Sequence, residues 1–283
     1  MISIPIRRYG AAILMLLTVI FSGEVLAKTH TDTTSYKAHS SKKISSKKIS
    51  SKKVSSKVSS KQEYSRNSVK SSSLPDLRKY PSGTPRKKAF LRTVMPYITS
   101  QNAAITADRN WLISKQYEGR WSPSERSRLK DIAKRYKISW SGNTKRIPWN
   151  TLLERVDIIP GSMVATMAAA ESGWGTSKLA RNNNNLFGMK CGRGSCNAPG
   201  KVRGYSHFDS VKDSVHAYVV NLNTHPAYAS FRKSRAQLRK ADQEVTASAM
   251  IHKLKGYSTQ GQRYNNYLFS MYQDNQRLIA AHM

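Results

Sequence analysis

Hydrophobic residues recur every three or four positions from about Lys88 to the end of the chain, which is the spacing of amphipathic helices. This spacing predicts a first helix that begins near Lys88 and a second helix over 102–116. Ser122-Pro123 supplies an N-cap and a first-turn proline for a third helix, and Pro148 begins a fourth. The pattern therefore predicts a mostly helical folded body.

The helix that begins at Pro160 is apolar around most of its circumference, which is typical of a buried core helix. Its last turn carries Glu171, and Gly173 and Gly175 end it. A carboxylate there loses hydration and faces the negative end of the helix dipole, and both effects favour its protonated form. That form suits a general acid. The alternative is a helix-terminal Glu that pairs with a surface Lys or Arg.

An aromatic residue and a run of amides follow this helix. Trp174 offers a flat face, and four consecutive Asn residues offer hydrogen-bond donors and acceptors, a combination that suits a sugar. The alternative is a loop whose Asn residues cap the next helix. The candidate sugar-binding residues of this segment are Trp174, Asn182, Asn183, Asn184, Asn185 and Phe187.

Residues 1–27 have the organisation of a signal peptide. Arg7 and Arg8 precede an apolar run over 11–21, and Val25-Leu26-Ala27 has the small-x-small pattern of a cleavage site. The run is shorter than the roughly 18–20 residues needed to span a bilayer. We expect a mature chain that begins at Lys28 and is periplasmic or secreted, and the alternative is an uncleaved N-terminal anchor.

Residues 28–88 form a Lys/Ser-rich segment built on the repeat Ser-Ser-Lys-Lys-Ile. A period of five matches neither a helix nor a strand, so the segment is predicted to be a disordered linker. It has 17 Lys and Arg residues and three acidic residues, in a chain with 48 basic and 16 acidic residues. Such charge indicates contact with an anionic cell-envelope polymer or membrane surface, and the alternative is a spacer without a partner. Nucleic acid is not expected, because an exported chain rarely meets it and the segment has almost no aromatic residues for base stacking.

Two motifs in order carry a family resemblance. Ala-Ala-Glu171-Ser-Gly-Trp-Gly followed by Asn-Asn-Leu186-Phe-Gly-Met-Lys resembles the glucosaminidase domains of glycoside hydrolase family 73. The earlier Asn102-Ala-Ala-Ile and Arg109-Asn-Trp-Leu make the chain more similar still to the Bax-type proteins of Gram-negative bacteria. The resemblance implies an α+β, mostly helical, lysozyme-like fold, with a helical lobe and a small β-lobe. It assigns 89–148 to a helical N-terminal part of the folded body and 149–283 to the catalytic domain.

The same resemblance implies roles for individual residues. Glu171 matches the general acid of the family, Tyr264 matches a tyrosine held close to the cleaved sugar, and Tyr257 is a second candidate contact. Asp209 is expected to be the N-cap of the helix that follows the β-lobe.

A second carboxylate is missing from the expected β-lobe, because the chain from Met189 to Phe208 contains no Asp or Glu. An inverting enzyme needs a second carboxylate at about 6.5–9.5 Å from the acid, and a retaining enzyme needs one at about 5–5.5 Å. The remaining mechanism is substrate assistance, in which the N-acetyl oxygen of the sugar attacks the anomeric carbon.

Cys191 and Cys196 are the only cysteines of the chain. We expect them to form a disulfide because the chain is predicted to be exported, and their spacing is not that of a redox pair. No metal site and no cofactor are expected, since no second pair of ligands and no nucleotide-binding motif is present.

Together these features predict a monomeric peptidoglycan hydrolase that cleaves β-1,4 bonds next to N-acetylglucosamine, an endo-β-N-acetylglucosaminidase. One alternative is a muramidase or lytic transglycosylase on the same fold. Another is a cell-wall-binding protein with weak catalysis or none.

Overall fold

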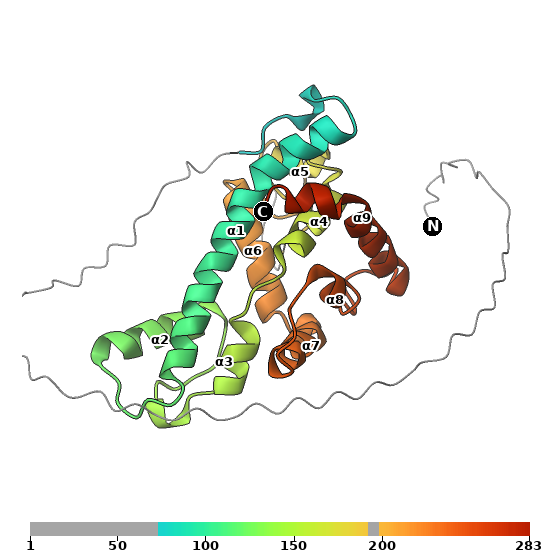
Figure 1. Ribbon diagram of the computed structural model, residues 1–283. Helices are drawn as coiled ribbons and strands as arrows, with labels where there is room; N and C mark the ends of the chain where they lie inside the picture. The colour runs from blue at the N-terminus through green and yellow to red at the C-terminus, as the bar shows by residue number, and fades with distance from the viewer. Residues whose placement is uncertain (1–72, 192–197) are drawn as a thin grey trace, which may run out of the picture. The chain divides into compact units, whose positions relative to one another are not determined.

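The computed structural model describes residues 73–191 and 198–283, and in these ranges the protein is mostly helical, as predicted (Figure 1). The expected signal peptide, most of the linker and Cys196 lie outside the described residues. The expected β-lobe is not seen in those residues, whose only β-pairing is an isolated antiparallel bridge between Lys190 and Tyr205. None of the helices described is both long and apolar enough to cross a membrane.

The helices are short apart from the first and the last. They are α1 (Thr84–Lys115), α2 (Pro123–Arg135), α3 (Trp149–Arg155), α4 (Gly161–Ser172), α5 (Lys178–Asn183), α6 (Val211–Thr224), α7 (Ala229–Lys240), α8 (Ala247–Ile251) and α9 (Gln262–Ala280). Three 3₁₀ turns join them: η1 (Leu77–Lys79), η2 (Thr144–Arg146) and η3 (Pro226–Tyr228).

Helix α4 is the centre of the core, as its uniformly apolar sequence predicts. It packs against α1, α8 and α9, and α1 also packs against α6. Its side chains from Met163 to Ala169 are all at most 1% exposed. Because α4 is held on several sides, the position of Glu171 at its C-terminal end is fixed by the packing of the whole body.

Helix α1 is one continuous helix where the sequence analysis expected two. Ile98, Ile105 and Leu112 are buried along one side of it, so the same apolar stripe passes through the expected break near Ser100. Pro96 lies inside α1 without ending it. Tertiary packing against α4 and α6 therefore outweighs the local loss of a backbone hydrogen bond at proline.

The folded body begins before residue 88, where the linker was expected to end. Leu74 and Leu77 are buried, and the backbone N–H of Leu74 donates to Asn184 Oδ1 at 3.0 Å. These residues approach Gly175, where an added Cβ would lie only 2.6 Å from Leu77 Cδ1. Leu74 and Leu77 therefore belong to the core, and the strongly basic composition around them hid these apolar residues.

Two cap predictions had different outcomes. Ser122 is the N-cap of α2 and forms a reciprocal capping box with Glu125, which confirms the predicted start of that helix. Asp209 is not the N-cap of α6. Ser210 takes that place, and its Oγ accepts a hydrogen bond from the backbone N–H of Asp213 at 3.1 Å.

Candidate active site

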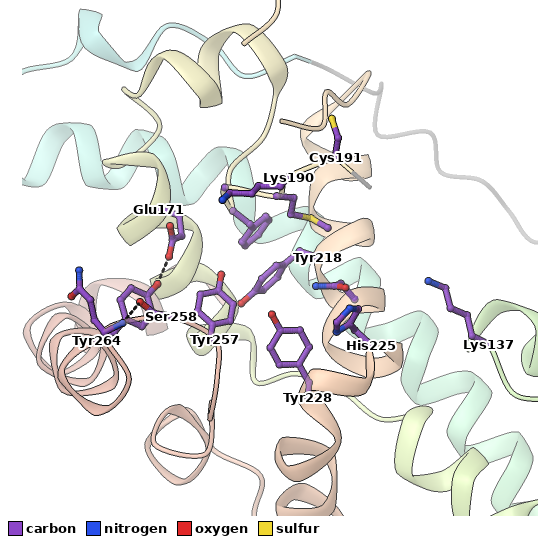
Figure 2. A pocket seen from close by; sticks show the side chains of 15 residues that line it. Lys137, Glu171, Lys190, Cys191, Tyr218, His225, Tyr228, Tyr257, Ser258 and Tyr264 are labelled. Atoms are coloured by element: carbon purple, nitrogen blue, oxygen red, sulfur yellow. Dashed lines mark hydrogen bonds between the residues drawn. The ribbon is translucent and has the colours of Figure 1, made fainter. Parts of the chain in front are cut away.

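A cavity of about 880 Å³ opens at the C-terminal end of α4 (Figure 2). Its walls come from five parts of the chain: the turn after α2, α4, the segment after Leu186, α6 with the turn that follows it, and the segment before and at the start of α9. The lining residues are Lys137, Glu171, Phe187, Gly188, Met189, Lys190, Cys191, Tyr218, Asn221, His225, Tyr228, Tyr257, Ser258, Gln260 and Tyr264.

Glu171 reaches this cavity because α4 ends directly after it. Gly173 is the C-cap with φ +59°, a left-handed conformation that glycine adopts without steric cost. The partly buried carboxylate accepts a hydrogen bond at Oε1 from the hydroxyl of Tyr264. A Cβ at Gly188 would lie 3.5 Å from Oε2, so glycine leaves that oxygen uncovered on this side.

Tyrosine rings form one wall beside Glu171. Tyr257 stacks on Tyr264 with 5.6 Å between ring centroids and 19° between planes, and its ring meets the edge of Tyr218 at 6.5 Å. Tyr228 lies 6.1 Å from Tyr257, and Phe187 stacks on Tyr218 at 3.9 Å. The wall offers flat apolar faces together with hydroxyl groups, which is a surface suited to a sugar ring.

The hydroxyl groups of this wall stay protonated over the ordinary pH range. Burial raises the pKa of Tyr264, and the charges of Tyr257 and Glu171 and the hydrogen bond to Glu171 raise it further. Burial and the charge of Glu171 likewise raise the pKa of Tyr257. Tyr264 is therefore a hydrogen-bond donor to Glu171 and not a base.

Glu171 is the only carboxylate among the residues that line the cavity in the described part of the chain. Asp209 is exposed and lies outside the lining, and Asp213 accepts a hydrogen bond from the hydroxyl of Ser210 at 2.6 Å. Over the described ranges no group of three or more His, Cys, Asp and Glu side chains gathers to hold a metal ion. The chemistry available here is proton transfer by one carboxylic acid next to a hydroxyl donor.

Comparison with known proteins places this site in a family. The family model described as mannosyl-glycoprotein endo-beta-N-acetylglucosaminidase, named Glucosaminidase, matches residues 148–277. Protein bax of Escherichia coli (strain K12) is 82% identical over 284 residues, with the whole of each chain covered. The chain belongs to the Bax-type proteins with a glucosaminidase domain. No solved structure matches it.

In this Bax-type chain, the matched region contains both Glu171 and Tyr264, and its domain type suggests a glycoside hydrolase. The two residues are far apart in sequence, on α4 and α9, and the fold brings them into direct contact. Tyr257 and Phe187 also line the cavity, and the contact with a sugar predicted for them remains a prediction. The Cys191–Cys196 disulfide remains a prediction, because Cys196 is not among the described residues.

Trp174 and the four Asn residues are not among the residues that line the cavity, and the sugar-binding role predicted for them stays a prediction. Trp174 packs edge-on against Phe90 with 5.6 Å between ring centroids, and the ammonium group of Lys87 lies 5.1 Å from its ring. Its φ of +56° results from the tight turn between Gly173 and Gly175. Trp174 therefore anchors the end of α4 to α1.

The Asn residues hold backbone segments in place. Asn183, Asn184 and Asn185 are at most 6% exposed. The side chain of Asn185 donates to the carbonyls of Met189 and Ser206, and its Oδ1 accepts from the N–H of Met189 at 3.0 Å. These buried amides hold the backbone of the cavity wall after Leu186 in place.

Several lining residues were missed by the sequence analysis. Tyr218, Asn221 and His225 lie three and four residues apart, so they share one face of α6 and the turn after it. That spacing was the available signal. Lys137 carried no such signal, because it lies outside the region matched to the family and reaches the cavity only through the tertiary fold.

Proposed function

We propose that this chain is an endo-β-N-acetylglucosaminidase that cleaves β-1,4 glycosidic bonds of peptidoglycan, with Glu171 as the general acid. The observation that carries the proposal is the contact between Tyr264 and Glu171 inside a tyrosine-walled cavity, within the region matched to glucosaminidases. The domain match supports a glycoside hydrolase, and the site supports the choice of acid.

The proton that Glu171 transfers is assigned to Oε2. Tyr264 donates its hydrogen bond to Oε1, so Oε1 acts as an acceptor and Oε2 is the oxygen that can carry a proton. Oε2 lies on the side of Gly188, where the absence of a side chain leaves room for a substrate oxygen. Protonation of the glycosidic oxygen allows the bond to the anomeric carbon to break, and its electron pair stays with the leaving sugar.

The attacking group in this proposal belongs to the substrate. The described lining has no second carboxylate, so neither the nucleophile of a retaining enzyme nor the base of an inverting one is available there. The acetamide oxygen then bonds to the anomeric carbon as the leaving group departs. Water next attacks the anomeric carbon and breaks its new bond to the acetamide oxygen, which opens the ring that this bond had closed. Ionised Glu171 accepts the proton of the water, and the configuration at the anomeric carbon is retained overall. Tyr257 and Tyr264 face the position that the acetamide would occupy.

The remaining features fit export to the cell envelope. We propose residues 1–27 as a signal peptide, the basic segment from Lys28 to the start of the folded body as a tether to anionic envelope polymer or membrane surface, and a periplasmic or secreted monomer. We further propose that the described residues around the Lys190–Tyr205 bridge correspond to the small β-lobe of a lysozyme-like fold.

The single carboxylate also favours one second candidate, a lytic transglycosylase. In that reaction a hydroxyl group of the substrate attacks the anomeric carbon, so it also needs one protein acid and no protein nucleophile. The two reactions differ in the bond cleaved and in the sugar end produced.

Release of soluble fragments from insoluble peptidoglycan tests whether the chain is a hydrolase that uses Glu171. The wild-type protein and the Glu118→Gln variant should release fragments, because Glu118 is exposed and is not among the residues that line the cavity. The Glu171→Gln variant should release none. Binding to the insoluble wall without release by any of the three proteins would show a binding protein and contradict the proposal.

A further inference from the structure

Lys137 brings the region before the glucosaminidase match into the cavity. It follows α2, eleven residues before the matched region begins at 148, yet it is one of the lining residues. Figure 2 shows it at the end of the cavity away from Glu171, beyond His225. The N-terminal helical part of the folded body therefore contributes a residue to one end of the cavity.

The backbone at Lys137 is held in a conformation that favours glycine. Its φ is +52°, directly after the C-terminus of α2, where the backbone N–H of Ile138 returns to the carbonyl of Ala133 at 2.8 Å. Arg155 of α3 fixes this turn by donating to the carbonyls of Tyr136 and Lys137 at 3.0 Å and 2.7 Å. A lysine at a position that usually has glycine indicates that its side chain is needed there.

The positive charge at this end of the cavity comes from Lys137. Its side chain is exposed and is in no ion pair within the residues that the structure describes. Lys190, the other lysine of the lining, lies nearer Glu171 (Figure 2). Exposed His225 also lines the cavity. Its Nδ1 accepts a hydrogen bond from the backbone N–H of Ala227, so its Nε2 carries a proton and can donate to another group. The single carboxylate of the lining, Glu171, lies at the other end.

We propose that Lys137, supported by His225, forms an anion-binding subsite that recognises carboxylate groups on the substrate strand. This inference rests on the proposed function. N-acetylglucosamine is neutral, so the carboxylates come from the neighbouring sugar, either from its lactyl group or from a peptide attached to that group. An exposed ammonium binds a carboxylate as a point charge, with modest energy and strong dependence on salt.

Binding and hydrolysis are measured on three preparations of one peptidoglycan: peptide-bearing strands, strands whose peptides have been removed to free the lactyl carboxylates, and peptide-bearing strands whose carboxylates have been converted to methylamides. The variants are Lys137→Met and Lys137→Gly, with Lys134→Met as the control. Lys134 is an exposed lysine of α2 that does not line the cavity. The glycine variant also relieves the left-handed conformation, so it should unfold no more easily than the wild-type protein.

Both Lys137 variants should raise KM on a carboxylate-bearing preparation roughly two- to fivefold with little change in kcat, as expected for one exposed charge pair. The effect should disappear on the methylamide strands and at high salt, and Lys134→Met should resemble the wild-type protein. An effect on peptide-bearing strands alone assigns the carboxylate to the peptide, and an effect on peptide-free strands alone assigns it to the lactyl group. An effect on both means that the subsite accepts either carboxylate. If the Lys137 variants raised KM equally on charged and neutral strands, or did not raise it on either, the inference would be overturned.

Binding measured in a Glu171→Gln background keeps this test separate from the proposed function. If no protein cleaves any strand, the proposed function fails. The subsite inference then depends on whether Lys137→Met still weakens binding to the charged strands and not to the neutral ones.

Discussion

The hydroxyl of Tyr264 on the C-terminal helix α9 donates a hydrogen bond to the candidate acid Glu171. Tyr264→Phe removes that hydrogen bond and keeps the ring stacked on Tyr257, so Glu171 loses its orientation but the wall remains. We expect kcat to fall roughly tenfold to hundredfold with a small change in KM, as for residues that position a functional group. Steady-state hydrolysis of soluble glycan strands measures both constants.

Tyr267→Phe is the matched control for this prediction. Tyr267 lies 6.3 Å from Tyr264 between ring centroids, but it is 54% exposed and does not line the cavity. Removal of the Tyr267 hydroxyl should leave kcat for glycan hydrolysis unchanged. An unchanged kcat in Tyr264→Phe as well would mean that the hydroxyl has no catalytic role.

The packing around Gly175 leaves no room for a side chain at this position. A Cβ there would lie 2.6 Å from Leu77 Cδ1 and 3.1 Å from Phe90, in a backbone with φ +78°. Gly175→Ala should reduce the free energy of unfolding by about 2–4 kcal/mol, from overpacking together with backbone strain. Gly142→Ala, with φ +89° and no atom within 4 Å of the added Cβ, should cost only about 1 kcal/mol from strain. Urea unfolding of both variants measures the difference, and equal losses would contradict the close contact.

At the scale of the elements, Asp157 joins three helical segments. The residue follows α3, and its 1%-exposed carboxylate lies 3.6 Å from Arg109 of α1, 3.7 Å from Arg235 and 3.0 Å from Arg239 of α7. Arg235 is fully buried, and burial lowers the pKa of its guanidinium to about 10. Removing the carboxylate would leave several guanidinium groups without their partner in a poorly solvated place.

Asp157→Asn should therefore reduce the free energy of unfolding by about 3–5 kcal/mol, the usual cost of breaking a buried ion pair on one side. Asp131→Asn on the exposed face of α2 should change it by less than about 0.5 kcal/mol. Denaturant unfolding at neutral pH compares the two variants. A small effect of Asp157→Asn would mean that the carbonyl groups around Arg235 alone hold α7 in place.

Capping residues and glycines in the sequence correctly predicted where individual helices begin and end. Ser122-Pro123 marked the start of α2, and Gly173 marked the end of α4 and so the place of Glu171. Contacts between distant residues had no such signal. The Asn residues became buried supports because Leu74 and the 202–208 segment bond to them, and α1 stayed one helix because it packs along α4 and α6. Lys137 reached the cavity by the same kind of long-range packing.

At the scale of the whole molecule, buried tyrosines make the fold sensitive to alkaline pH. Burial raises the pKa of Tyr136 from 10.0 to about 12, and it also raises the pKa values of Tyr218, Tyr257 and Tyr264. The unfolded chain loses these protons at lower pH than the folded protein does. Their contribution to stability is therefore fully present below pH 10.0 and is lost as the pH rises towards the values of the folded protein.

The free energy of unfolding should fall above pH 10.0, by about 1.4 kcal/mol per pH unit for each tyrosine that ionises only in the unfolded chain. Tyr136→Phe removes one such group and should make the fall less steep between pH 10.0 and about 12. Urea unfolding at a series of pH values measures both slopes. Identical slopes in the two proteins would show that Tyr136 does not contribute.

The central claim is that this molecule hydrolyses the bond next to N-acetylglucosamine with Glu171 as the acid. The most direct test is digestion of purified peptidoglycan by the full chain and by its Glu171→Gln variant, followed by borohydride reduction and mass spectrometry of the sugar ends. We expect reduced glucosamine ends from the wild-type protein and none from the variant. Muramic acid ends or anhydro-sugars, or glucosamine ends that persist in the variant, would contradict it.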